Sequence, residues 1–116
     1  MNILNKFLKR INRKLTRSCI FKKIDYFTLQ QMIREDSSII LLDVRSEQEY
    51  KEGHLLGALN IPLGHIENKV NYIIPNKYQK IIVYCQMGGR SKKAINKLLK
   101  KGYTKLYQLD GGLDSI

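Results

Sequence analysis

The sequence predicts an α/β fold in which a mostly parallel central sheet carries helices on both faces. Residues 38–44 and 80–85 are continuous apolar runs, as is typical of strands that are buried on both sides. Strand-like and helix-like segments alternate after residue 24, which favours parallel pairing. The 116 residues suit one domain, and a domain of this size buries a core without help from disulfides.

The first three elements after residue 24 are predicted from caps and apolar patterns. They are a helix over residues 28–36 that is capped by Thr28, a strand over residues 38–44, and a helix over residues 46–53 that begins at Ser46 and ends at Gly53.

The remaining elements continue the alternation. They are a short strand over residues 57–62, a helix over 64–74, a buried strand over 80–85, a helix over 90–102 that stops at Gly102, and a strand with a turn over 105–112.

Basic residues are concentrated at the N-terminus. The chain has a formal net charge of +11, and residues 1–23 contain eight basic residues and no acid. Apolar side chains recur there at helical spacing: Leu4, Phe7, Leu8, Ile11 and Leu15. Residues 1–23 are therefore predicted to be a basic amphipathic arm. The arm could pack on the body or lie on an anionic membrane surface. A nucleic-acid arm is the third possibility, but Phe7 and Phe21 are the only aromatic residues among the charges of residues 1–23, so no nucleic-acid partner is expected.

The two cysteines, Cys19 and Cys85, are too few for a disulfide framework and indicate a reducing compartment. We therefore expect a cytoplasmic protein, peripheral at the membrane if the arm binds one. Cys19 lies in the arm and could resolve an oxidised Cys85, although an incidental thiol is the simpler interpretation.

The segment "CQMGGRS", which starts at Cys85, is suited to holding an anion against a sulfur. Gly88 and Gly89 let the backbone curl so that the N–H groups of residues 86–90 face one point. A helix that begins near Arg90 directs its positive end there, and the guanidinium adds charge. These features predict a nucleophilic Cys85 with a lowered pKa. The alternative is that Cys85 is a small buried residue at a strand end.

Residues 43–62 carry a second group of candidates whose roles are mostly structural. Asp43 could accept hydrogen bonds from loop amides or pair with Arg45. Glu49 could pair with Arg45 at i,i+4. His54, beside a glycine, is more typical of a hydrogen-bonded structural group than of a catalyst.

In this order, the two stretches resemble the single-domain rhodaneses, a family of sulfurtransferases. Residues 43–62 match the pattern Asp-Val-Arg, Glu-Tyr, Gly-His, Gly-Ala and Asn-Ile-Pro. Residues 85–91 match Cys, two variable residues, Gly, one variable residue, Arg and Ser, and Gly111-Gly112 fits the closing pair. The resemblance covers residues 24–116, which are predicted to be a rhodanese-like domain.

The resemblance implies that Cys85 is the catalytic nucleophile. It would take a sulfur from a small anionic donor, thiosulfate or a small persulfide, and pass it to a thiol or a protein cysteine. No metal or cofactor is expected. The implied substrate-binding residues are Gln86, Met87, Gly88, Gly89, Arg90 and Ser91. The implied structural support consists of Asp43, Arg45 and His54.

Two other functions remain open on the sequence alone. Phosphatases and arsenate reductases of the related type also combine a cysteine, a loop of amides and an arginine. In those phosphatases the loop is one residue longer than the four residues between Cys85 and Arg90. A non-catalytic rhodanese-like module for binding or regulation is the second alternative, but such modules often lose the cysteine that this chain keeps.

Overall fold

The computed structural model describes residues 21–116, and its sheet has five parallel strands in the order β1-β5-β4-β2-β3. The elements in chain order are β1 (Phe21–Ile24), α2 (Tyr26–Glu35), β2 (Ile40–Asp43), α3 (Glu47–Glu52), β3 (Leu59–Asn60), the 3₁₀ turn η1 (Leu63–His65), α4 (Ile66–Ile73), β4 (Ile81–Tyr84), α5 (Gly89–Lys100), β5 (Leu106–Leu109) and the 3₁₀ turn η2 (Gly112–Ser115).

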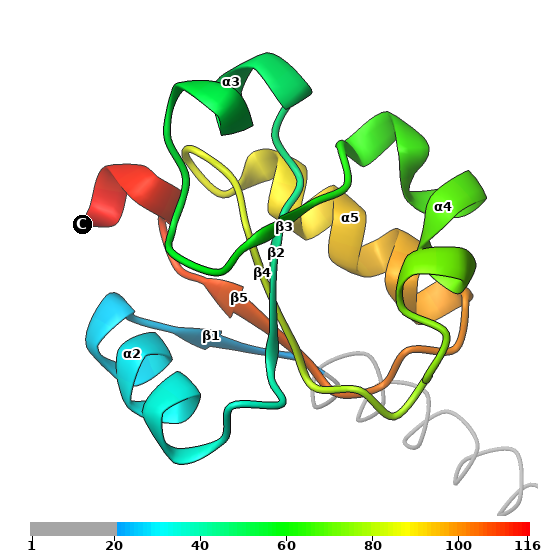
Figure 1. The fold of residues 1–116 in the computed structure, drawn as a ribbon, viewed down its shortest axis with the longest axis horizontal. Helices are drawn as coiled ribbons and strands as arrows, with labels where there is room; N and C mark the ends of the chain where they lie inside the picture. Colours follow the sequence, from blue (N-terminus) through cyan, green and yellow to red (C-terminus); the bar gives the residue numbers. More distant parts are fainter. Residues whose placement is uncertain (1–20) are drawn as a thin grey trace, which may run out of the picture.

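Helices cover both faces of the sheet, with α2 on one side and α4 and α5 on the other (Figure 1). The central strand β4 shows why. Ile81 and Val83 belong to the core under α4 and α5, whereas Ile82 and Tyr84 belong to the core on the α2 side. Each fully buried side chain of this kind contributes about 1.5–3 kcal/mol. The α/β fold predicted from the alternation of elements and from the two apolar runs is confirmed.

The first strand was not predicted. Phe21, Lys22 and Lys23 belong to β1 and not to the basic arm, because they pair with β5 in a register that runs from Phe21↔Leu106 to Ile24↔Leu109. Charged residues on an edge strand discourage pairing with other chains. Here the two lysines of β1 also continue the basic composition of the arm, so the sequence pattern does not indicate a strand. Residues 1–20 of the predicted helical arm over residues 1–23, Cys19 included, lie outside the described residues.

The start of α2 also differs from the prediction. Its N-cap is Asp25, whose Oδ1 accepts a hydrogen bond from the Thr28 backbone N–H at 2.8 Å. Thr28 is therefore the donor in the first turn and not the cap. Asp suits the cap position as well as Thr does, and the prediction did not consider Asp25.

The caps predicted for the other helices agree with the structure. Ser46 begins α3 in a capping box with Glu49, and Gly53 ends it. The segment predicted as one helix over residues 64–74 consists of η1 followed by α4. No helix within residues 21–116 combines the length and the apolar character needed to cross a membrane.

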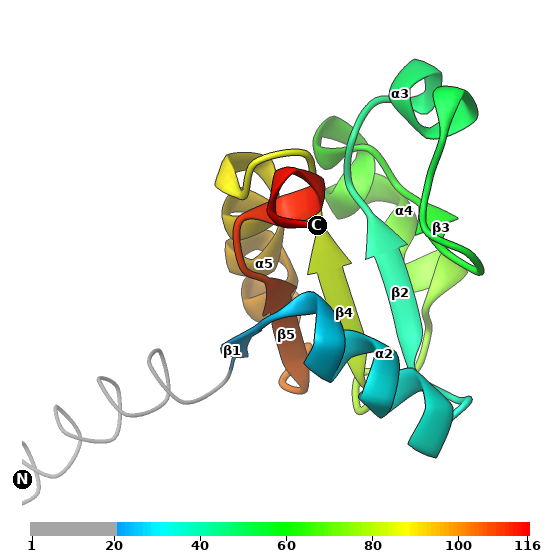
Figure 2. The ribbon, with the colours of Figure 1, turned by 90° about the vertical axis from the view of Figure 1, so that its left-hand side faces the viewer.

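The carboxyl ends of the strands meet at one edge of the sheet. Figure 2 shows the arrowheads of β2 and β4 pointing to the edge where α3, the start of α5 and η2 gather. From β2 the chain continues outward to β3, and from β4 it continues to β5 on the opposite side of the sheet. The segments that follow β2 and β4 therefore diverge, and ligands of parallel α/β sheets bind in such a crevice.

Candidate active site

Cys85 directly follows β4 at this edge, and its side chain is 0% exposed. Two backbone N–H groups point at its sulfur: that of Gly88, with N···Sγ of 3.1 Å, and that of Ser91, with N···Sγ of 3.3 Å. The Ser91 hydroxyl oxygen lies 3.5 Å from the same sulfur. The loop thus surrounds the sulfur with donors. The N–H group of Gly88 belongs to the predicted range of residues 86–90, whereas that of Ser91 lies one residue beyond it.

The loop can curl this tightly because of Gly88. Gly88 is the N-cap of α5 and has φ of +119°, in the left-handed region that favours glycine. Lys92 N–H donates to the Gly88 carbonyl at 3.1 Å in the first bond of the helix. The N–H groups before Lys92 precede this bond and project toward the loop, as at any helix start.

These contacts lower the pKa of the Cys85 thiol from its ordinary value. Burial raises the pKa because it penalises the charged form. Hydrogen bonds from the Ser91 side chain and from the N–H groups of Ser91, Gly88 and Met87 outweigh this effect. The thiolate is therefore favoured by hydrogen bonding in a buried site, which is a known way to activate a cysteine.

Gln108 on β5 supports the loop from behind and was missed by the sequence analysis. Its Nε2 donates to the Gly88 carbonyl at 2.9 Å and to the Ser91 hydroxyl at 2.8 Å, and its side chain is 4% exposed. The only available signal was one amide side chain in an otherwise apolar strand, "LYQL". Buried amides need partners, but the sequence does not say which.

Arg90 is held by Glu49 of α3. Its two terminal nitrogens lie 2.5 and 3.0 Å from the two carboxylate oxygens. This bidentate pair lowers the pKa of Glu49 to about 2. The pairing of Glu49 with Arg45 that the i,i+4 spacing suggested is wrong, because Arg45 turns toward Asp43. Arg90 brings positive charge to the loop, but a carboxylate partly offsets it.

Arg45 and Asp43 form a buried pair beneath the loop. Asp43 accepts from the Arg45 backbone N–H at 2.9 Å and from its Nη2 at 2.8 Å, as one of the two predictions for Asp43 expected. Arg45 also donates to the Gly53 carbonyl at 2.6 Å and lies 3.5 Å from Gln86 Oε1. The pair therefore connects the ends of α3 and the first residue after Cys85.

The C-terminal turn closes the other side of the loop. Leu113 N–H donates to the Cys85 carbonyl at 3.0 Å, and Asp114 N–H donates to the Gln86 carbonyl at 2.9 Å. Gly112 has φ of +64°, and a Cβ there would lie 2.5 Å from both of these carbonyl oxygens. Only glycine fits at this contact.

Residues 28–116 match the family model of the rhodanese-like domain. The chain belongs to the rhodanese-like domain family. Among curated relatives, the uncharacterized protein YqhL of Bacillus subtilis is 43% identical over 72 residues, which are 62% of this chain and 56% of YqhL. Thiosulfate sulfurtransferase PspE of Escherichia coli is 36% identical over 75 residues, which are 65% of this chain and 71% of PspE.

Solved structures agree with the family. The human single-domain sulfurtransferase TSTD1 superimposes with a TM-score of 0.70 at 26% identity, covering 80% of this chain and 92% of TSTD1. The chain spans about half the length of the first curated relatives that it matches, 56% of YqhL and 48% of the putative sulfur carrier protein YrkF of B. subtilis.

The loop brings some of the predicted residues to the sulfur and turns others away from it. Gly88 and Ser91 contact the sulfur of Cys85, whereas the Gln86 side chain turns away and donates to Asp114 at 2.6 Å. Met87 is 74% exposed at the loop tip. The roles predicted for these residues in binding a substrate stay predictions.

His54 lies outside the loop. Its Nδ1 is 2.8 Å from the Tyr50 carbonyl oxygen, and its ring stacks on that of Tyr50 at 3.7 Å. Both contacts are local to the end of α3 and the turn that follows. In this position His54 supports Gly53, whose carbonyl accepts from Arg45, and does not reach the sulfur.

Proposed function

We propose that the chain is a sulfurtransferase that carries a sulfane sulfur as a persulfide on Cys85. The observation that carries the proposal is the pair of N–H groups, from Gly88 and Ser91, directed at the buried sulfur. They favour the thiolate that must attack the donor. The names of PspE, a thiosulfate sulfurtransferase, and YrkF, a putative sulfur carrier, support the same chemistry.

In the first step, the Cys85 thiolate attacks the outer sulfur of thiosulfate. A bond forms between Sγ and that sulfur, the S–S bond of thiosulfate breaks, and its electron pair leaves on sulfite. The persulfide keeps one negative charge on its outer sulfur. The N–H groups at the start of α5 would stabilise that charge, as helix N-termini stabilise anions.

In the second step, an acceptor thiolate attacks the outer sulfur of the persulfide. The acceptor becomes a persulfide, and the electron pair of the broken bond returns to Cys85 as the thiolate. Cyanide would react in the same way and yield thiocyanate. Neither step transfers a proton when Cys85 and the acceptor thiol react as thiolates. The lowered pKa of Cys85 therefore favours it as the attacking group in the first step and as the leaving group in the second.

Phosphate ester hydrolysis is less well supported. Arginine forks often bind phosphate bidentately, but the two terminal nitrogens of Arg90 are already hydrogen-bonded to the two oxygens of Glu49. The loop of four residues between Cys85 and Arg90 is also short for a tetrahedral oxyanion.

Thiocyanate formation from thiosulfate and cyanide tests the proposal. We expect turnover by the wild-type chain, none by Cys85→Ser, and no phosphate release from aryl phosphates by either. 3-Mercaptopyruvate, a carboxylate donor that would leave pyruvate in place of sulfite, should react more slowly than thiosulfate. Absence of thiocyanate with both donors and with glutathione persulfide would overturn the proposal.

A further inference from the structure

The exposed side of α5 carries a continuous row of lysines. Each of its exposed or half-exposed positions from residue 92 on is occupied by lysine, except for Asn96 and the half-exposed Leu99. The lysines are Lys92, Lys93, Lys97 and Lys100 of the helix and its C-cap Lys101, which together we call the α5 lysine face. Within the described part of the chain, Lys97 is the one member with an acidic partner, Glu67 at 3.4 Å. The helix contains no acid.

The start of this row is unfavourable for the helix itself. Lys92 and Lys93 lie in and just after the first turn of α5, where the helix end is already positive. Acidic residues are preferred there, and a lysine costs a few tenths of a kcal/mol. The first turn lacks an acid that would compensate. Sequences that break a local rule without compensation tend to do so at functional sites.

The lysine face begins beside Cys85. The sulfur receives the N–H group of Ser91, the residue before Lys92. From there α5 runs about 18 Å away from the loop, at about 1.5 Å for each of its 12 residues. Because Cys85 is fully buried, an acceptor thiol must approach the loop closely, and the residues around that thiol would then come near the start of α5.

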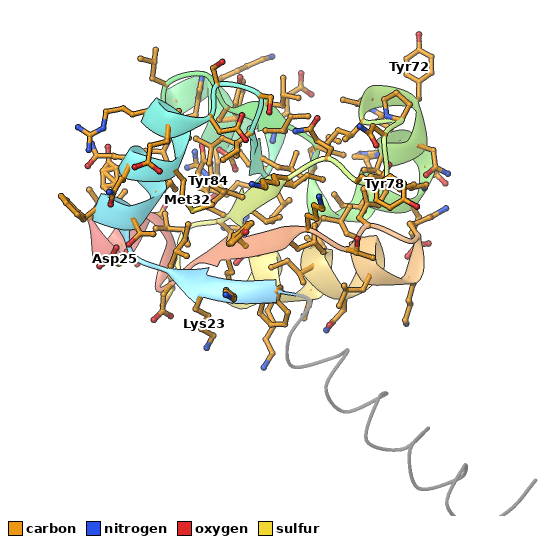
Figure 3. All side chains as sticks on the ribbon, turned by 90° about the horizontal axis from the view of Figure 1, so that it is seen from below. Lys23, Asp25, Met32, Tyr72, Tyr78 and Tyr84 are labelled. Atoms are coloured by element: carbon orange, nitrogen blue, oxygen red, sulfur yellow. The ribbon has the colours of Figure 1, made fainter. Side chains whose placement is uncertain are left out.

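The chemistry of the face favours a protein over a membrane or a nucleic acid. The large apolar side chains exposed on residues 21–116 do not include any from α5, so nothing there would insert between lipids. The exposed aromatic rings of Tyr72 and Tyr78 project from α4 and from the segment after it (Figure 3), and α5 offers none on which bases could stack.

We propose that the α5 lysine face binds acidic side chains around the cysteine of a protein acceptor, and that such acceptors take the sulfur fastest. The inference rests on the proposed persulfide at Cys85 and names the class of acceptor. Complementary charges at the edge of a contact mainly accelerate encounter and set orientation. Small neutral thiols gain nothing from the face.

The test uses the full-length protein loaded with sulfur by thiosulfate and separated from the donor. Discharge is followed with two cysteine peptides of identical length, one with Glu around the cysteine and one with Gln. Each rate is divided by the rate of the same peptide with a small persulfide in solution, which removes differences in thiol pKa. Measurements are made at about 0.01 M ionic strength, where the Debye length is about 30 Å, and at about 1 M, where it is about 3 Å.

Two double variants separate the face from the overall charge. Lys92→Glu/Lys93→Glu reverses the start of the α5 lysine face. Arg34→Glu/Lys69→Glu makes the same change in net charge at exposed positions on α2 and α4. The readout is the ratio of the Glu-peptide rate to the Gln-peptide rate, so a changed pKa of Cys85 cancels.

We expect the wild-type protein to prefer the Glu peptide about tenfold at low ionic strength and to lose the preference at high ionic strength. The α5 variant should lose it, and the control variant should keep most of it.

Equal rates with both peptides, or equal losses in both variants, would overturn the inference while leaving the proposed function intact. Failure to load any sulfur would instead overturn the proposed function. If the α5 variant weakens binding of a single-stranded RNA but not the peptide preference, the face is a nucleic-acid surface and the inference is wrong.

Discussion

The hydroxyl of Ser91 has two acceptors within reach, the Gly88 carbonyl at 2.9 Å and the Cys85 sulfur at 3.5 Å. While the cysteine is a thiol, the hydroxyl can donate to the carbonyl. Once the sulfur is a thiolate, the hydroxyl stabilises it best by donating to the sulfur. Gln108 makes this exchange inexpensive, because its amide donates to the Gly88 carbonyl as well and keeps that oxygen paired.

Replacing Gln108 with leucine should therefore raise the pKa of Cys85. Hydrogen bonds to charged groups are stronger than those between neutral groups, and Gln108 acts on the sulfur only through Ser91 and Gly88, so the increase should be smaller than that caused by removing the Ser91 hydroxyl itself. The pH dependence of alkylation by iodoacetamide measures it. Gln31→Leu, on the exposed side of α2, is the control. An unchanged alkylation profile in a folded Gln108→Leu protein would show that Gln108 only packs.

Among single residues, the sequence predicts those contacts of the site whose two partners belong to the same loop. Cys85, Gly88 and Ser91 are close in sequence, so their meeting at one sulfur follows from the turn and the helix start. Gln108 is 20 residues from Gly88, and Glu49 is 41 residues from Arg90. Their contacts depend on which strands are neighbours, and no local pattern specifies that.

Two neighbouring elements, α3 and α5, are joined across the crevice by Glu49 and Arg90. The pKa of Glu49 is about 2 because Arg90 hydrogen-bonds to it, compared with 4.5 ordinarily. A carboxylate with a lowered folded pKa stabilises the protein fully above its unfolded pKa. Its contribution falls as pH decreases through the window from 4.5 to about 2.

We expect Glu49→Gln to destabilise the protein by about 0.5–1 kcal/mol at pH 7, since the two side chains are 32% and 38% exposed and solvent screens them. Glutamine preserves the capping box, so the loss reports the ion pair. Urea unfolding from pH 7 to pH 3 should show the difference shrinking below pH 4.5. Glu47→Gln, whose partner Lys51 is 3.5 Å away on the open surface, is the control and should cost almost nothing. A difference that is constant with pH would contradict this account of the pair.

The turn η2 must lie directly on the loop, and Gly112 is what allows it. Gly112→Ala should cost about 2–4 kcal/mol, because the new Cβ meets two carbonyl oxygens at 2.5 Å and the backbone is left-handed. Gly57→Ala separates these two causes, since Gly57 has φ of +81° but open space around it. It should cost about 1–2 kcal/mol. If urea unfolding gives equal losses for both variants, the close contact of η2 with the loop is not as described.

Across the whole molecule, the sequence predicted the buried strands β2 and β4 but not the edge strand β1. β2 and β4 are apolar on both faces, because helices cover both sides of the sheet. β1 has one side without a neighbouring strand, and its two lysines resemble the arm that precedes them. Its place beside β5 is a long-range pairing, so composition suggested a domain boundary at residue 24 where the sheet has already begun.

Truncation tests the place of β1. A chain that starts at Phe21 keeps the strand, whereas one that starts at Asp25 loses the four residues paired with β5 and the buried Ile24. We expect the shorter chain to be less stable than the longer one by about 2–4 kcal/mol in urea unfolding. If both truncated chains unfold at the same urea concentration, β1 contributes nothing to the sheet.

The formation of a persulfide on Cys85 is the central claim about this protein, and intact mass spectrometry tests it most directly. The reduced protein is weighed after brief exposure to thiosulfate and again after cyanide, in parallel with Cys85→Ser. We predict a gain of one sulfur atom that cyanide removes and that the serine variant never shows. An unchanged mass, or a gain that persists in Cys85→Ser, would contradict the account.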